Sequence, residues 1–151
     1  MKSRKFVLDT NCFIDASRIP KAREAYEVFC AEAAPGLHLS AVVAAELRAG
    51  TTNARERRTF EELVLAPYVR RNRVLTPSAR SWEALGTTLS MLQEQEGLVL
   101  AQTPKSFIFD ILVAHSCRET GAILVSRNTK DLARIATVFS FEYVEPYPAL
   151  K

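Results

Sequence analysis

The chain has 151 residues, of which 48% are hydrophobic, and this is enough for one domain over residues 1–151 whose core needs no disulfide or structural metal. The net charge of +3 is too small to indicate nucleic-acid binding by itself, and the longest apolar run is far shorter than the roughly 20 residues of a membrane span. Three cysteines without CxxC spacing, and an N-terminal apolar segment that aspartates interrupt, predict a cytoplasmic protein with reduced thiols.

Short apolar segments that end in polar residues predict β-strands. The first, residues 6–8, is apolar throughout, as expected for a strand that is covered on both faces. Further strands are predicted at residues 37–40, 74–76, 122–126 and 141–144.

Between these strands, apolar residues recur at spacings of three and four, which predicts amphipathic helices. A short helical turn should follow the first strand, Pro67 should break or kink a charged helix, and Trp82 should lie on the apolar stripe of a helix that Ser78 opens. Residues 97–105 are predicted to be a loop, and Ser106 to cap the helix after it. The predicted helices span residues 20–33, 41–50, 54–71, 78–92, 107–119 and 128–135. Because strands alternate with helices, we predict an α/β fold with a parallel sheet covered on both faces.

Three carboxylates interrupt apolar segments. Asp9 ends the first predicted strand, Glu46 interrupts a helix rich in alanine and valine, and Asp110 lies in a helix that is apolar nearly all round. If these carboxylates converge, their mutual repulsion raises their pKa values unless a divalent cation compensates, and oxygen ligands favour Mg²⁺ or Mn²⁺. Alternatively, Asp9 is only a helix cap, and Glu46 is a hydrogen-bonded polar group of the core.

A fourth group of polar residues, 126–131, directly follows a predicted strand, so its place matches that of Asp9. In parallel α/β folds, ligands bind beyond the carboxyl ends of the strands. Asn128 and Asp131 are therefore candidate site residues. The alternative is ordinary capping, in which Asn128 begins the next helix and Asp131 favours its dipole.

Polar and basic residues flank these positions. Thr10 and Asn11, directly after Asp9, are candidate donors that orient the ligands or a water molecule. Arg48 and Arg127 are candidate contacts to substrate phosphates, which would position a nucleic acid without reading its sequence. The alternative is that these arginines solvate helix faces or pair with nearby glutamates. Further candidate contacts to substrate phosphates, with the same alternative, are Arg55, Arg57 and Arg58.

In their order and spacing, these motifs resemble the PIN domain, and most closely the VapC-like toxins of prokaryotic toxin–antitoxin pairs. The resemblance covers about residues 5 to 145. The motifs that carry it are Val7-Leu8-Asp9-Thr10-Asn11, then Ser40 with Glu46-Leu47 and Gly50, then Asp110 to Ala114, and then Ser126 to Leu132.

The resemblance implies a three-layer α/β/α sandwich around a mostly parallel sheet and an endoribonuclease activity that depends on Mg²⁺ or Mn²⁺. It implies metal-ligand roles for Asp9, Glu46 and Asp110, a neutralising antitoxin protein as partner, and commonly a homodimer. The chain departs from the family at Asn128, where many members have an aspartate. Asn128 can ligate through its amide oxygen, and Asp131 is the other candidate for this fourth position.

The hypothesis that follows is that Asp9, Glu46 and Asp110 hold one or two divalent cations, which activate water for in-line attack on an RNA phosphodiester. Two other classes stay open. The first is a PIN-type nuclease that works in RNA processing or on DNA. The second is a catalytically impaired module that binds nucleic acid or protein, and Asn128 is the residue that favours it.

Overall fold

A five-stranded parallel sheet forms the centre of the computed structural model, which describes residues 4–150. The strand order is β3-β2-β1-β4-β5. The strands are β1 (Lys5–Leu8), β2 (Leu37–Ser40), β3 (Val74–Leu75), β4 (Ala122–Val125) and β5 (Tyr143–Val144). All five lie where the sequence predicts them, although β3, β4 and β5 are shorter than predicted.

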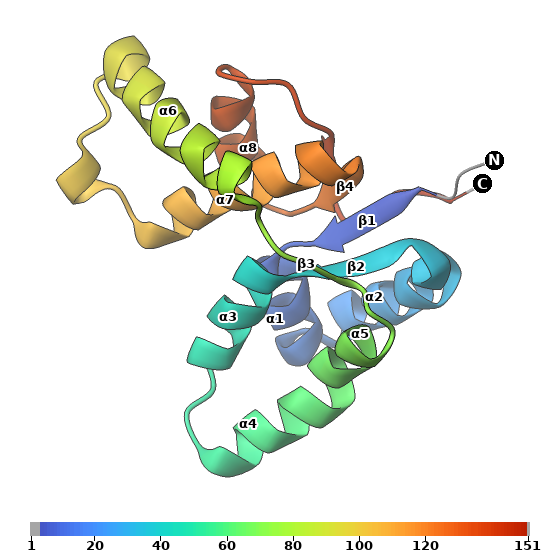
Figure 1. Cartoon of the computed structure of the whole chain (residues 1–151). Helices are drawn as coiled ribbons and strands as arrows, with labels where there is room; N and C mark the ends of the chain where they lie inside the picture. Colours follow the sequence, from blue (N-terminus) through green and yellow to red (C-terminus); the bar gives the residue numbers. More distant parts are fainter. Residues whose placement is uncertain (1–3, 151) are drawn as a thin grey trace.

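Helices cover both faces of this sheet, so the predicted α/β/α sandwich is confirmed. Figure 1 shows α6, α7 and α8 on one side and α1, α2, α4 and α5 on the other, with α3 beside the ends of β1 and β2. The helices are α1 (Thr10–Arg18), α2 (Pro20–Ala33), α3 (Ala41–Ala49), α4 (Ala54–Phe60), α5 (Ala66–Arg70), α6 (Ala79–Glu96), α7 (Lys105–Thr120) and α8 (Thr129–Ala136).

The central strand β1 is buried on both faces, which explains its unbroken apolar sequence. It pairs with β2 on one side and with β4 on the other, so that Phe6 lies opposite both Leu37 and Ile123. After β1 the chain moves outward through β2 to β3, and it later returns to β4 on the other side of β1. The order of the strands therefore reverses between β1 and β4, and the crevice beyond such a switch point is where open α/β sheets bind ligands.

Two glycines fix how the chain enters the strands beside β1. A Cβ atom on Gly36, directly before β2, would lie 1.9 Å from the carbonyl oxygen of Arg4, so only glycine allows this close approach of the two strands. Gly121 ends α7 with a φ of 73°, in the left-handed region that glycine adopts without strain, and β4 begins at the next residue. The predicted end of this helix at Gly121 is confirmed.

The beginnings of two helices differ from the predictions. The segment after β1 is the nine-residue helix α1 and not a short turn. Helix α7 begins at Lys105, so Ser106 is not its cap. Pro104 takes the capping position instead, and its carbonyl oxygen accepts hydrogen bonds from the N–H groups of Phe107 and Ile108. A short 3₁₀ turn, Leu100–Gln102, lies within the predicted loop.

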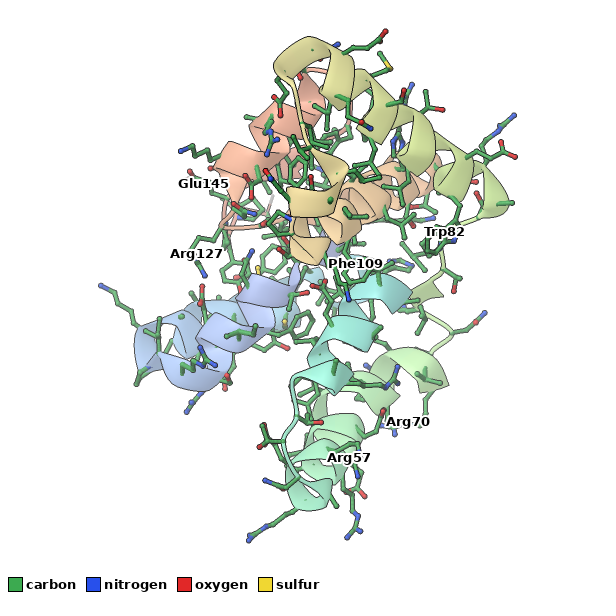
Figure 2. All side chains as sticks on the ribbon, turned by 90° about the vertical axis from the view of Figure 1, so that its left-hand side faces the viewer. Arg57, Arg70, Trp82, Phe109, Arg127 and Glu145 are labelled. Atoms are coloured by element: carbon green, nitrogen blue, oxygen red, sulfur yellow. The ribbon has the colours of Figure 1, made fainter. Side chains whose placement is uncertain are left out.

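The predicted burial of Trp82 is wrong, because its side chain is 56% exposed. The buried face of α6 instead begins one residue earlier, at Ser81, whose hydroxyl group donates a hydrogen bond of 2.7 Å to Glu119. One residue corresponds to about 100° around a helix, so burial of Ser81 turns Trp82 toward the outside. Figure 2 shows Trp82 at the outer side of the molecule.

Residues 54–73 form a projection, called the arm below, that consists of α4, a π-helical turn (Glu61–Leu65), α5 and the turn before β3. The helix continues past Pro67, which lies in the first turn of α5, directly after the π-helical turn. Of the predicted break or kink at Pro67, the break is wrong. The irregularity lies in the turn before the proline, where a wider backbone spiral leads into a residue that cannot donate a hydrogen bond.

Two further sequence predictions concern membrane-spanning segments and the cysteines. None of the helices between residues 4 and 150 is both long and apolar enough to cross a membrane. Cys12, Cys30 and Cys117 are free thiols, as predicted.

His115 is a buried polar residue of α7 and is independent of the predicted site. Its Nε2 atom lies 2.8 Å from the hydroxyl oxygen of Thr88 on α6, and its ring stacks on Phe139 with a centroid distance of 3.7 Å. Burial lowers the pKa of His115 to about 4, and the neighbouring positive charge of Arg118 acts in the same direction. The folded protein therefore keeps this imidazole neutral.

We expect His115 to destabilise the fold in acid. The unfolded chain takes up a proton at this residue below its ordinary pKa near 6.5, whereas the folded protein does not do so until about pH 4. His115 should therefore contribute a loss of stability between pH 6.5 and pH 4, of about 2 kcal/mol on going from pH 7 to pH 5, whereas the raised pKa of Asp110 acts in the opposite direction. Urea unfolding at both pH values measures the net change, and the contribution of His115 is the difference between the parent protein and His115→Gln, which does not titrate. The same pH dependence in both proteins would contradict the assignment.

Candidate active site

Asp9 lies at the carboxyl end of β1 and is 4% exposed. Its Oδ1 atom accepts a hydrogen bond of 2.8 Å from the N–H group of Thr10, so Asp9 does cap α1. Its Oδ2 atom accepts hydrogen bonds from the hydroxyl group of Ser126 at 2.7 Å and from the side-chain amide of Asn11 at 3.3 Å. Burial raises the pKa of Asp9, and the hydrogen bonds from Ser126 and Thr10 oppose that rise. The cap and site interpretations of Asp9 are therefore compatible.

Glu46 is brought to Asp9 by α3, which begins directly at the end of β2. The hydroxyl oxygen of Ser40 accepts hydrogen bonds from the N–H groups of Val42 and Val43, so the predicted cap is confirmed. The Oε1 atom of the half-buried Glu46 accepts a hydrogen bond of 3.0 Å from the hydroxyl group of Thr10. Burial and the negative charge of Asp9 raise the pKa of Glu46, and the bond from Thr10 opposes the rise.

Asp110 approaches the same edge of the sheet from α7 and is 8% exposed. Burial raises its pKa to about 8, and the negative charges of Asp9, Glu46 and Asp131 add to that rise. The predicted convergence of the carboxylates is thus visible in the effect of the other negative charges on the pKa of Asp110. The residues that take part lie up to 122 positions apart in the sequence.

Asn128 links the two remaining acidic residues. Its side-chain nitrogen donates hydrogen bonds to Oδ2 of Asp131 at 2.9 Å and to Oδ2 of Asp110 at 3.3 Å. Asn128 occupies the N-cap position of α8 and Asp131 lies in the first turn of this helix, as the capping alternative predicted, but the side chain of Asn128 makes no capping hydrogen bond. The amide instead provides a neutral donor between two carboxylates.

Ser126 is a site residue that the sequence prediction did not assign individually. It is completely buried, it donates to Asp9, and its hydroxyl oxygen accepts hydrogen bonds from the Asn11 side chain at 3.0 Å and from the N–H group of Asn128 at 3.1 Å. It thereby joins the loop after β1 to the loop after β4. The sequence feature that could have identified Ser126 is its position as the first polar residue after the apolar strand β4.

Arg48 and Arg127 do not converge on the carboxylates. Arg48 forms an ion pair with Glu61 of the π-helical turn, and Arg127 forms one with Asp15 of α1 at 2.8 Å. In Figure 2, Arg127 lies beside α1, whereas Phe109, the neighbour of Asp110, lies between α7 and α3. Both arginines are thus engaged with acidic side chains outside the cluster of carboxylates.

The chemistry of the cluster fits a hard divalent cation. Asp9, Glu46 and Asp110 offer only oxygen atoms as ligands. Burial raises the pKa values of all three carboxyl groups, and neighbouring negative charges add to the rise at Glu46 and Asp110. Within residues 4–150, no three acidic, histidine or cysteine side chains are gathered closely enough to form a ready metal cage. The carboxylates therefore interact over a distance and have not closed around a common centre.

A groove of about 720 Å³ extends from Glu46 along α1, α3 and the arm. Its lining combines apolar side chains with charged residues of both signs, namely Arg18, Arg55, Glu46 and Glu56. Leu63 is 73% exposed although it lies in this groove. The apolar lining residues are Phe13, Ile14, Leu47, Phe60, Leu63 and Val64.

Comparison with known proteins identifies the family. The family model of the PIN domain matches residues 6–138, which is most of the chain, so this protein belongs to the PIN domain family. No curated protein sequence is similar enough to count as a relative.

Solved structures share the fold at low sequence identity. A chain of VapBC2 from Rickettsia felis, bound to a DNA fragment from its promoter, is 22% identical, with a TM-score of 0.67 over 93% of this chain and 97% of that one. DNA-bound VapBC from Salmonella typhimurium gives 20% identity and a TM-score of 0.65 over 95% and 99%. A toxin–antitoxin complex from Klebsiella pneumoniae gives 20% identity and a TM-score of 0.60 over 96% and 100%. The expected resemblance to the PIN domain is confirmed.

We expect Asn128→Asp to destabilise the protein in the absence of divalent cations. The change replaces a donor by a fifth carboxylate, between Asp110 and Asp131, and hydrogen bonds to charged groups contribute roughly 1.5–3 kcal/mol each. The loss should be roughly 2 kcal/mol in urea unfolding with EDTA present, and Mn²⁺ should reverse most of it. The matched control is Asn53→Asp, which replaces another asparagine at a helix start, away from the acidic cluster. Equal losses in both variants would contradict a special role for Asn128.

Proposed function

We propose that this protein is a metal-dependent endoribonuclease and the toxin of a toxin–antitoxin pair. The observation that carries the proposal is that three buried or half-buried carboxylates, Asp9, Glu46 and Asp110, lie at the switch point of the sheet, where the negative charges of Asp9 and Glu46 raise the pKa of Asp110. Asp9, Glu46 and Asp110 would hold Mg²⁺ or Mn²⁺. When bound, such a cation lowers the pKa of water and stabilises the negative charge that develops on a phosphodiester in the transition state.

The surrounding residues would orient the ligands. Ser126 and Asn11 hold one carboxylate oxygen of Asp9 from the side of β4, and Thr10 holds Oε1 of Glu46. Because these donors are attached to the ends of two paired strands, the ligand atoms are fixed by the sheet itself. On the other side, Asn128 would either keep its amide on Asp110 and Asp131 or present its amide oxygen to the cation.

A neutralising protein partner is the second part of the proposal. Chains of similar fold occur in toxin–antitoxin complexes, which supports such a partner for this chain. The groove that begins at Glu46 offers this partner an apolar surface that leads directly to the proposed catalytic residues. A segment with apolar side chains bound there would cover Glu46 and block the site. The proposal also includes a homodimer and a cytoplasmic location, where an RNA target is available.

One observation favours a different function. Asn128 already donates hydrogen bonds to Asp110 and Asp131, and this satisfies part of their negative charge without a cation. A PIN module that has lost catalysis and binds nucleic acid or protein would retain such an arrangement. A PIN-type nuclease in RNA processing or DNA metabolism is the other alternative. Binding of a divalent cation distinguishes our proposal from the module that has lost catalysis. The nucleic acid that is cleaved distinguishes it from the nuclease in RNA processing or DNA metabolism.

Asp110→Asn should abolish RNA cleavage without harming the fold. Loss of a direct ligand should lower the cleavage rate roughly 100-fold or more. In EDTA the variant should be at least as stable as the parent protein, because a neutral amide replaces a carboxyl group whose charged form is disfavoured by burial and by the charges of Asp9 and Glu46. Mn²⁺ at about 100 times its Kd should stabilise the parent protein by about 2.7 kcal/mol, and the variant much less.

Cleavage of a labelled RNA and thermal unfolding with and without Mn²⁺ measure these effects. Glu142→Gln is the matched control, since this exposed glutamate pairs with Arg4 at the opposite end of β1. No stabilisation of the parent protein by Mn²⁺ would exclude the metal site and favour the impaired module, and stabilisation without cleavage of RNA or DNA would contradict the proposed nuclease activity.

Leu63→Asp should prevent neutralisation by the partner while cleavage continues. Its side chain is 73% exposed, so a charge is tolerated there in the free protein but opposes an apolar partner in the groove. Val69→Asp is the matched control, because Val69 lies exposed on the same arm but does not line the groove. Co-expression with the product of the adjacent reading frame and measurement of growth would reveal the effect. Neutralisation that is equally good for both variants would contradict this binding site.

A further inference from the structure

The charge of the protein is concentrated on the arm. Residues 54–73 contain six arginines and three glutamates, whereas the other 131 residues contain fourteen basic and fourteen acidic side chains. The arm therefore accounts for the whole net charge of +3. Its basic residues are Arg55, Arg57, Arg58, Arg70, Arg71 and Arg73.

The glutamates of the arm do little to neutralise these arginines. Glu61 forms its ion pair with Arg48 of α3, and Glu56 accepts hydrogen bonds from the N–H and hydroxyl groups of Thr52, at 3.2 and 2.9 Å. Arg73 differs from the other arginines, because its guanidinium group donates to the carbonyl oxygen of Pro35. The remaining five are exposed, and in the described part of the chain no carboxylate lies within 4 Å of their side chains.

The position of the arm links these arginines to the proposed active site. Neither α4 nor α5 contains a buried residue, and Figure 1 shows the arm running along the end of the molecule away from α6. Arg55 lines the groove that begins at Glu46. Figure 2 shows Arg57 and Arg70 on the arm, below the face that carries Phe109 and Arg127. The basic surface thus starts at the edge of the groove and extends away from the acidic cluster.

We propose that the arm binds backbone phosphates of the RNA substrate at a distance from the cleaved bond. All six basic residues of the arm are arginines, whose planar guanidinium groups pair with phosphate oxygens in a bidentate manner. From Arg57 to Arg70 the helical arm extends about 20 Å, at 1.5 Å per residue, which spans several nucleotides. This surface compensates for the acidic site, which repels the same phosphates. The inference rests on the proposed function for the identity of the substrate as RNA.

Binding of a fluorescent 20-nucleotide single-stranded RNA tests this inference. The measurement is made in EDTA, so that the RNA stays intact whether or not the protein is a nuclease. Each phosphate contact of a single strand contributes roughly 0.7 to the slope of log affinity against log salt concentration. Arg57→Gln/Arg70→Gln should therefore lower this slope by about 1.4, with about tenfold weaker binding at 50 mM salt. Lys21→Gln/Arg80→Gln is the matched control, because it removes two exposed positive charges outside the arm that form no ion pair in the described structure, and it should keep the slope.

The outcomes distinguish the arm from the catalytic proposal. An unchanged slope in the arm variant, or equal losses in both variants, would overturn the role of the arm, whatever Asp110→Asn does to cleavage. If the arm variant keeps its RNA affinity but loses binding to poly-L-glutamate, the arm binds an acidic protein and the inference is equally overturned. If the slope falls as expected while no RNA is cleaved in Mn²⁺, the arm is an RNA-binding surface and the proposed catalysis has failed.

Discussion

The burial of negative charge at one edge of the sheet is the constraint on which the rest of the structure depends. Three carboxyl groups with raised pKa values are held there by β1, α3 and α7, and each loses hydration when the chain folds. Hydrophobic burial of the strands stabilises the fold and thereby keeps these carboxyl groups in place. Around the carboxylates, every charge is offset in part by a neutral donor, namely Thr10, Asn11, Ser126 or Asn128.

These donors also determine how the two halves of the site relate. Asn11 and Ser126 connect the loops that follow β1 and β4, so the position of Asp9 depends on the register between these two strands. On the other side, Asn128 joins α7 to the start of α8 through Asp110 and Asp131. Among the residues that the structure describes, no buried polar side-chain atom lacks a hydrogen-bond partner. The site is thus a hydrogen-bonded network without unpaired buried polar atoms, in which burial still disfavours the charged form of the carboxyl groups.

Positive charge is placed outside this network. Arg48 and Arg127, which lie near the site in the sequence, form ion pairs with Glu61 and Asp15, whereas the exposed arginines of the arm have no such partners in the described structure. Separation of this kind lets an anionic polymer be attracted to the protein without neutralising the carboxylates that a cation requires. The groove therefore lies between the acidic cluster of the site and the basic surface of the arm.

The sequence by itself determined the strands, the α/β class and the three main carboxylates, because these depend on local signals: an apolar run that ends in Asp9, a helix capped by Ser40, and a charge inside the apolar helix of Asp110. It did not determine the orientation of Trp82, since a shift of one residue around α6 depends on what Ser81 meets on a neighbouring helix. Nor did it determine the bonds of Asn128 or the central place of Ser126, whose partners lie 18 and 117 residues away. Tertiary structure alone decided these features, because hydrogen bonds between loops exist only after strands far apart in the sequence have paired.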